Sequence, residues 1–231
     1  MRESMTFRAD WRDITKDFPD KYFDLASCDP PYFDGPQKRK FYGTAISKRN
    51  VKRVDYPIIE SWDIPQSDYA EEMLRISKKQ VIWGINYYPH LFSGSGRLVW
   101  DKCNGSSSYS DAEIAYVSCH DSVRLFRFMW NGMNQGKSLS EGHIMQGDKT
   151  KNETRIHTNQ KPVILYDYIN SNYVPEGGKV FDSHLGSGSN RISSHKMQNI
   201  DFYGCEKDLT QFKRQEKRWK EYSSQLQLFH F

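Results

Sequence analysis

Residues 22–32 read Tyr22-Phe23-Asp24-Leu25-Ala26-Ser27-Cys28-Asp29-Pro30-Pro31-Tyr32, and no other stretch says as much about the chemistry of the chain. The first seven residues form a mostly apolar run that predicts a buried strand. The corner that follows is rigid, because two prolines fix their backbone φ angles. At the end of a strand, the Asp29 carboxylate can accept from an exocyclic amine while the Tyr32 ring stacks on a flat heterocycle. These residues alone leave open an ordinary Pro-Pro turn with an incidental aspartate.

A second signal lies about one domain length further on, in Phe181-Asp182-Ser183-His184-Leu185-Gly186-Ser187-Gly188-Ser189. Gly186 and Gly188 come directly after an apolar run, and glycines there let backbone N–H groups approach a ligand closely. Arg191 occupies the place of the third glycine of the dinucleotide fingerprint, so the glycines alone are weak evidence. Glu206 strengthens the signal, because it closes the next apolar run roughly 20 residues later, where ribose hydroxyls are accepted.

Together the two motifs resemble those of the amino-methyltransferases of DNA, which transfer a methyl group from S-adenosylmethionine (SAM) to an exocyclic nitrogen of a base. Residues 29–32 resemble the catalytic motif of that family, and residues 182–188 resemble its cofactor loop. The catalytic motif comes first in this chain, as in the permuted class called beta. The resemblance implies an α/β, Rossmann-like SAM-dependent methyltransferase fold. Its sheet would be seven-stranded and mostly parallel, in circularly permuted order, with one reversed strand near an edge.

For catalysis, the resemblance implies a division of roles within residues 29–32. Asp29 would hold one N–H of the target amine and stabilise the positive charge that develops there, and the Pro30 carbonyl would accept the other N–H. Pro31 would keep the corner rigid. Tyr32 would stack on the extruded base, because a base inside a duplex offers no open path to its exocyclic nitrogen.

For the cofactor, the resemblance implies contacts from Asp10, Asp29, Lys161, Asp182, His184, Gly186, Ser187, Gly188 and Glu206. Asp182 would help to position the methionine portion of SAM, Glu206 would bind its ribose, and Asp10 would lie close to its adenine. Lys161 belongs to the segment His157-Thr158-Asn159-Gln160-Lys161-Pro162, which resembles the family segment before the helix that completes the methionine pocket. The chain departs from the family pattern at Asn159, Ser183, His184, Ser189 and Asn190.

The pattern of apolar residues predicts strands over residues 5–10, 22–28, 80–85, 97–101, 113–118, 178–182 and 200–205. It predicts helices over residues 68–79, 162–173 and 208–222, and a turn and helix within 183–197. Ser67 is the predicted N-cap of the first helix. Residues 123–130 alternate apolar and basic side chains, which favours a further strand. Strands that alternate with helices predict an α/β sheet with parallel core strands.

We expect one methyltransferase domain over residues 1–231 with two insertions. Residues 34–60 form a basic loop insertion, since they contain glycine and proline without a periodic pattern. Residues 125–156 are the second insertion and the candidate for target recognition. The first insertion contains a run of basic residues without an acidic one: Lys38, Arg39, Lys40, Lys48, Arg49, Lys52 and Arg53. Such a run binds phosphate and releases counterions, so double-stranded DNA is the expected partner. A solvated basic loop is the alternative.

The composition is that of a globular protein, with 37% hydrophobic, 27% charged and 14% aromatic residues in a chain of 231. These proportions exclude a disordered chain. The sequence has no apolar stretch long enough to span a bilayer, and its first residues lack the apolar segment of a secretory signal. We therefore expect a cytoplasmic protein that does not enter membranes. No Cys-x-x-Cys pair is present, which favours free thiols over disulfides or zinc, and we expect no metal.

The expected activity is site-specific methylation of DNA at the exocyclic N6 of adenine after base flipping. N4 of cytosine is the first alternative, and adenine is preferred because the family's cytosine enzymes more often carry Ser at the position of Asp29. RNA or protein methylation is the second, although those enzymes usually carry Asn there and place the cofactor loop first. A non-catalytic nucleic-acid-binding module is the third, and the intact motif residues argue against it. The sequence leaves the target sequence and the oligomeric state open.

Overall fold

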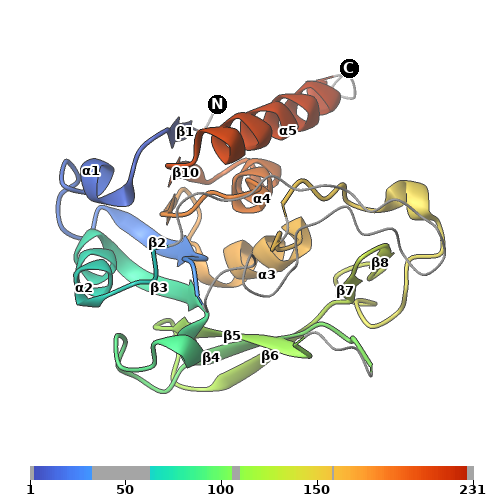
Figure 1. Ribbon diagram of the computed structural model, residues 1–231, viewed down its shortest axis with the longest axis horizontal. Helices are drawn as coiled ribbons and strands as arrows, with labels where there is room; N and C mark the ends of the chain where they lie inside the picture. The colour runs from blue at the N-terminus through green and yellow to red at the C-terminus, as the bar shows by residue number, and fades with distance from the viewer. Residues whose placement is uncertain (1–2, 33–62, 106–109, 158, 228–231) are drawn as a thin grey trace.

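The computed structural model of the protein describes residues 3–32, 63–105, 110–157 and 159–227. Its centre is an eight-stranded sheet in the order β1-β10-β9-β2-β3-β5-β4-β6 (Figure 1). In this order, the strands span Ser4–Phe7, Asp201–Cys205, Lys179–Asp182, Phe23–Cys28, Ser77–Trp83, Ala112–Val117, Arg97–Asp101 and Val123–Arg127. The first five strands of this order are parallel, β5 runs antiparallel to both of its neighbours, and β6 is parallel to β4. The sheet is therefore mostly parallel, with one reversed strand near an edge.

The predicted fold class is confirmed, and all of the predicted strands form, with shifted ends except for the strand predicted over 97–101. The predicted count of seven is wrong, because β6 adds an eighth strand from the first half of the alternating segment 123–130. β6 pairs with β4 from Val123↔Arg97 to Arg127↔Asp101. Only Phe126 of this strand is buried. Backbone pairing at the edge of the sheet therefore holds β6, and such pairing requires no apolar face of its own.

The helices of the described residues are α1 Trp11–Thr15, α2 Ser67–Ile76, α3 Val163–Tyr173, α4 Ser189–Met197 and α5 Leu209–Gln227. Figure 1 shows α1 and α2 on one side of the sheet and α3 and α4 on the other, with α5 packed beyond α4. Side chains of β3 alternate between the two layers. Trp83 belongs to a core cluster with Leu165 of α3, whereas Ile82 belongs to a second cluster with Met73 of α2. The central strands are therefore buried on both faces, as parallel strands usually are.

The boundary between α2 and β3 differs from the prediction. The helix predicted over 68–79 ends before Ser77, whose backbone is extended with φ −125° and ψ 148°. The Ser77 hydroxyl donates to the carbonyl of Met73 at 2.5 Å, and the chain then pairs directly with β2. Pairing within the sheet thus overrides the helical spacing of the side chains that follow. Gln66 occupies the N-cap in place of the predicted Ser67, and no side chain caps the helix there.

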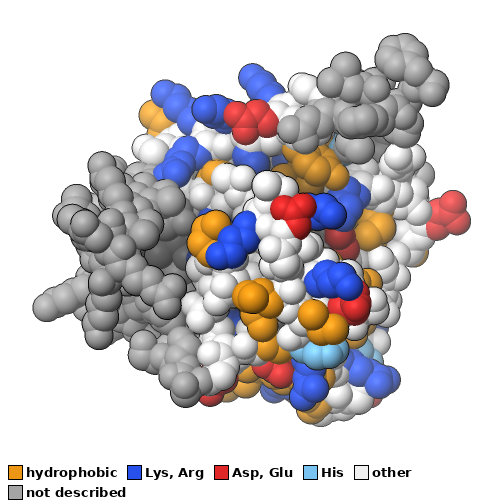
Figure 2. Space-filling model, turned by 90° about the vertical axis from the view of Figure 1, so that its right-hand side faces the viewer, with side chains coloured by type: hydrophobic (Ala, Val, Ile, Leu, Met, Phe, Trp, Pro, Cys, Tyr) orange, Lys and Arg blue, Asp and Glu red, His pale blue; other side chains and the backbone are white. Residues whose placement is uncertain are grey.

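The two predicted insertions have different outcomes. Residues 125–156 contain the end of β6, the short strands β7 (Trp130–Asn131) and β8 (Asn134–Gln135), and the 3₁₀ helix η2 (Lys149–Lys151). The insertion at 34–60 lies outside the described residues, and with it the predicted DNA contacts Lys38, Arg39, Lys40, Lys48, Arg49, Lys52 and Arg53. On the face that Figure 2 turns to the viewer, Lys and Arg side chains are scattered among hydrophobic and neutral ones.

Two kinds of feature are absent from the described residues. None of their helices is long and apolar enough to cross a membrane. The same residues contain no group of three or more His, Cys, Asp or Glu side chains that could hold a metal ion.

The topology brings the two sequence motifs together. β2 and β9 are parallel neighbours, with Leu25 opposite Val180 and Ala26 opposite Phe181. The corner after β2 and the loop after β9 therefore leave the same edge of the sheet side by side. β10 and β1 continue the parallel set and end at this edge too. A crevice at the carboxyl ends of parallel strands is where α/β sheets bind their ligands.

Candidate functional site

A cavity at this edge is lined by most of the residues predicted from the sequence: Asp10, Asp29, Pro30, Pro31, Tyr32, Lys161, His184, Gly186, Ser187 and Glu206. Asp182 is buried at the end of β9, and Gly188 forms the N-cap of α4, so neither is part of the lining. Trp11, Tyr166 and Gln211 line the cavity but were missed from the sequence. They are helix residues without a motif, and only the packing of α1, α3 and α5 around the loops reveals them.

Lys161 joins the catalytic corner to the rest of the site. Its Nζ lies 2.5 Å from Asp29 Oδ1 and 2.9 Å from Glu113 Oε2, and its side chain is only 2% exposed. Burial alone would lower the pKa of Lys161, but the two carboxylates raise it above its ordinary value. Burial also raises the pKa of Asp29, although the Lys161 ammonium opposes this. The predicted cofactor residue Lys161 thus meets carboxylates of the protein at the end of the cavity formed by residues 29–32.

Tyr32 is held at both ends of its side chain. Its hydroxyl donates to Glu113 Oε2 at 2.8 Å. Its ring stacks on Tyr87, with 5.1 Å between ring centroids and 21° between planes. Gly84 lies against the ring with φ +79°, and a Cβ there would lie 2.4 Å from Tyr32 Cδ1. The orientation of the ring is therefore fixed by contacts within the protein.

Glu113 and Lys102 belong to this site, but the sequence analysis did not identify them. Lys102 Nζ lies 2.5 Å from Glu113 Oε1. Burial opposes ionisation of Glu113, yet Lys161 and Lys102 together hold its pKa well below its usual range. One signal could have found the pair: Lys102 follows one predicted strand and Glu113 begins the next. If these strands pair as an antiparallel hairpin, both residues lie at the same edge of the sheet.

The loop after β9 carries the glycines next to Glu206. Glu206 Oε2 accepts from the Gly186 N–H and Oε1 accepts from the Asp208 N–H, each at 3.0 Å. Burial disfavours the charged form of Glu206 more strongly than these two hydrogen bonds favour it, so the pKa of Glu206 lies above its ordinary value. Gly188 starts α4 with φ +73°, a left-handed conformation that favours glycine. Two backbone donors thus fix the orientation of the Glu206 carboxylate, and its remaining lone pairs can accept from hydroxyl groups.

Asp182 and Ser183 are buried at the start of the loop, and His184, which is partly exposed, lines the cavity beside them. Asp182 Oδ1 accepts from the His184 N–H at 3.1 Å, and burial raises the pKa of Asp182 to about 7. His184 Nδ1 lies 2.8 Å from Ser183 Oγ, which lies 2.9 Å from Tyr69 Oη. Burial lowers the pKa of His184 to about 4, so this imidazole is neutral at pH 7. Ser183 and His184 stand where the family pattern has Pro and Phe, and here they form a polar chain instead.

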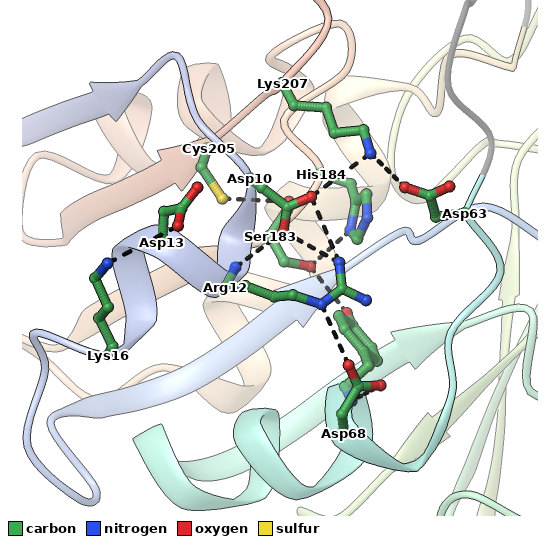
Figure 3. A network of polar contacts seen from close by, with 11 residues as sticks. Asp10, Arg12, Asp13, Lys16, Asp63, Asp68, Ser183, His184, Cys205 and Lys207 are labelled. Atoms are coloured by element: carbon green, nitrogen blue, oxygen red, sulfur yellow. Dashed lines mark hydrogen bonds and ion pairs between the residues drawn. The ribbon is translucent and has the colours of Figure 1, made fainter.

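Asp10 lies at the other end of the cavity in a network of ion pairs (Figure 3). As the N-cap of α1, its carboxylate accepts from the Arg12 N–H at 3.0 Å. It also pairs with the Arg12 guanidinium at 3.3 Å and with Lys207 Nζ at 3.5 Å. Lys207 also pairs with Asp63, and Arg12 pairs with Asp68. Burial disfavours the charged form of Asp10, but the backbone bond and the two cations hold its pKa below the ordinary value.

The comparisons with known proteins identify the fold. No protein-family model matches the chain, and no curated protein matches it. Solved structures do match. M1.HpyAVI in complex with SAM superimposes with a TM-score of 0.56 at 16% identity, over 93% of this chain and 98% of that one. TTHA0409 from Thermus thermophilus, which carries the name putative DNA modification methylase, gives 0.54 at 13% identity over 95% of both chains.

A third structure is the PvuII DNA methyltransferase, which is cytosine-N4-specific. It superimposes with a TM-score of 0.53 at 10% identity, over 89% of this chain and 82% of that one. The three structures are similar to nearly the whole chain, so the described architecture is that of DNA methyltransferase structures. At these identities the similarity establishes the fold, and the chemistry must be argued from the site.

We expect Gly84→Ala to cost more stability than Gly132→Ala. Both glycines have positive φ, +79° and +60°, and a side chain at either position costs about 1 kcal/mol for that reason. Only at Gly84 does the new Cβ collide with Tyr32, whereas nothing lies within 4 Å of a Cβ at Gly132. Overpacking adds about 1–3 kcal/mol. Urea unfolding of both variants measures the difference, and equal losses would show that Tyr32 is not fixed against Gly84.

We expect Asp182→Asn to change how stability depends on pH. Since burial raises the pKa of Asp182 from 3.8 to about 7, the folded state keeps a proton that the unfolded state loses. The stabilisation is therefore complete below about pH 4 and lost as the pH rises through about 7. The free energy of unfolding of the wild type, relative to Asp182→Asn, should fall by up to about 4 kcal/mol over this interval and then stay constant. Urea unfolding between pH 4 and 8 measures it, and a pH-independent difference contradicts the raised pKa.

Proposed function

We propose that the protein transfers a methyl group from SAM to the exocyclic N6 of an adenine in double-stranded DNA. One observation carries the proposal: the Asp29–Tyr32 corner and the Gly186–Gly188 loop with Glu206 converge on one cavity. The fold around this cavity is that of DNA methyltransferase structures. The catalytic corner precedes the loop in the chain, which supports membership in the permuted beta class.

The residues of the cavity fit SAM as a cofactor. SAM supplies a methyl group on a sulfonium, and M1.HpyAVI and TTHA0409 have each been solved in complex with it. Glu206 would offer lone pairs to ribose hydroxyls, Asp10 would lie near the adenine, and Asp182, buried behind the lining, would help to position the methionine portion. Gln211 Oε1 is buried at this cavity without a hydrogen-bond partner among the described residues. A buried acceptor of this kind calls for a donor from a ligand.

The corner would orient the target base. Asp29 accepts one N–H of the amine and the Pro30 carbonyl accepts the other, so the nitrogen lone pair is directed at the methyl group. Tyr32 stacks on the flipped base, and its hydroxyl bond to Glu113 keeps the ring in place. As the amine gains positive charge during transfer, the Asp29 carboxylate stabilises it. Orientation and charge stabilisation are the contributions that this reaction requires.

Adenine is proposed over cytosine because Asp29 stands where the cytosine enzymes of the family more often carry Ser. The fold does not discriminate, since the PvuII enzyme is cytosine-N4-specific and superimposes almost as well as the others. RNA or protein methylation is less favoured because those enzymes usually carry Asn at this position. The intact motif residues Asp29, Tyr32, Gly186, Gly188 and Glu206 argue against a non-catalytic binding module, because a decayed site would be expected to lose at least one of them.

The decisive experiment is transfer from methyl-labelled SAM to unmethylated DNA, followed by digestion to nucleosides. We expect labelled N6-methyladenine. Labelled N4-methylcytosine would overturn the choice of base, and label in RNA or protein alone would overturn the choice of polymer. A protein that does not bind SAM at all would favour the non-catalytic module.

Within this reaction we expect Asp29→Ala to abolish transfer, with kcat lowered by at least about 100-fold because charge on the amine is no longer stabilised. Its dissociation constant for SAM, measured by calorimetry, should stay within about twofold, since the loop and Glu206 carry that contact. Asp121→Ala, at an exposed aspartate outside the cavity, is the control and should leave both values unchanged. Loss of SAM binding in Asp29→Ala would contradict this division between corner and loop.

A further inference from the structure

Glu113 lies on β5, a strand that carries none of the motifs, yet its carboxylate holds three partners at the catalytic end of the cavity. Oε1 lies 2.5 Å from Lys102 Nζ. Oε2 accepts from Tyr32 Oη at 2.8 Å and lies 2.9 Å from Lys161 Nζ. The side chain is 18% exposed, and that of Lys102 is 16% exposed. A carboxylate this enclosed is retained only when every lone pair serves a partner.

The charges of this cluster balance. Asp29 and Glu113 contribute two carboxylates, and Lys102 and Lys161 contribute two ammonium groups. In an enclosed site, removing one member leaves an uncompensated charge, which is strongly unfavourable. Because Lys102 neutralises Glu113 on its far side, Lys161 can pair with Asp29 and Glu113 at once. Asp29 therefore shares its cation and keeps more of its basicity than it would have with Lys161 to itself.

We propose that Glu113, with Lys102 as its counter-ion, is a positioning residue for methyl transfer: it fixes the Tyr32 ring and shares the Lys161 ammonium, so that Asp29 accepts the target amine. This inference rests on the proposed function. Glu113 itself does not touch the base or the cofactor. It acts through Tyr32 and Lys161, and its effect should therefore appear in the chemical step rather than in SAM binding.

Variants of Glu113 and of Lys102 should shift the pKa of Asp29 in opposite directions. Glu113→Gln removes a negative charge near Asp29, so the pKa of Asp29 should fall. Lys102→Met removes a positive charge, so the pKa of Asp29 should rise. In the wild type, Glu113 raises the pKa of Asp29 and Lys102 lowers it, so the loss of each neighbour should shift the pKa in the direction stated. The other titratable groups that face Asp29 stay in place in both variants: Lys161, Tyr32, Tyr88, Tyr166 and Asp182.

The test is the pH dependence of kcat for DNA methylation. We expect the acid limb, where Asp29 must lose its proton, to move by about one pH unit to lower pH in Glu113→Gln and to higher pH in Lys102→Met. We expect kcat of Glu113→Gln to fall about tenfold at the optimum, with the SAM dissociation constant within about twofold. Asp24→Asn is the matched control, because Asp24 is also 18% exposed and paired with a lysine, at the opposite end of β2. Its acid limb should not move.

A second readout needs neither DNA nor SAM. Carbon-13 NMR of labelled aspartate, with the Asp29 signal identified by its loss in Asp29→Asn, reports the pKa of Asp29 in the protein alone. If the wild type methylates no DNA, the proposed function fails, while this titration still decides whether Glu113 and Lys102 set the basicity of Asp29. Shifts of opposite sign in the two variants support it, and shifts of the same sign or none overturn it.

The double variant Lys102→Met/Glu113→Gln covers the case in which a single variant fails to fold. It removes both charges together, so no uncompensated charge remains. We expect its Asp29 pKa to lie between those of the two single variants and below the wild-type value, because Asp29 then has Lys161 to itself and Glu113 acts more strongly on Asp29 than Lys102 does. A double variant that follows either single variant instead would contradict the charge balance.

Discussion

The Lys161 ammonium, enclosed between Asp29 and Glu113, is the interaction on which the arrangement of the site depends. It joins three segments that are distant in the sequence: the corner after β2, the start of β5 and the segment before α3. A cation that is only 2% exposed must have carboxylate partners, and carboxylates this enclosed must have a cation. Each segment therefore holds the others in place. The Asp29–Tyr32 corner takes its shape from this mutual requirement as much as from its two prolines.

The segment before α3 that carries Lys161 is also held by contacts on the side of the Gly186–Gly188 loop. Arg218 of α5 donates to the carbonyl of Ser187 at 2.8 Å and pairs with Glu153 at 2.6 Å. Glu153 in turn accepts from Gln160 at 2.7 Å and from the Val163 N–H at 2.8 Å. The described residues of 153–163 form no strand of the sheet, so these charged contacts substitute for strand pairing. The loop, the second insertion and the start of α3 are thereby joined on one side of the cavity, opposite the Lys161 cluster.

The sequence predicts well whatever depends on local pattern and poorly whatever depends on pairing across the fold. The apolar runs located the core strands, and the two motifs located the corner and the loop, because each is a short stretch with its own chemistry. The predicted end of α2 is wrong because pairing of Ser77 with β2 decides it, and the strand favoured over 123–130 ends early, at Arg127, because an edge strand is fixed by pairing rather than by burial. Glu113 was missed for the same reason. A charged residue at a strand end looks solvated until the neighbouring strand brings Lys102 beside it.

The two ends of the cavity also differ in electrostatics, and under the proposed function this difference has a use. At the catalytic end, equal numbers of carboxylates and ammonium groups suit a neutral base that becomes positive only during transfer. At the loop end, burial raises the pKa values of Asp182 and Glu206, so their ionised forms gain most when a cation or a strong donor arrives. A sulfonium cofactor with an ammonium group and ribose hydroxyls supplies both. In the protein alone, burial makes the ionised forms of these carboxylates unfavourable. A neutral or anionic molecule would leave that unfavourable free energy uncompensated, so the same burial makes the site selective for a ligand that supplies a cation or a strong donor.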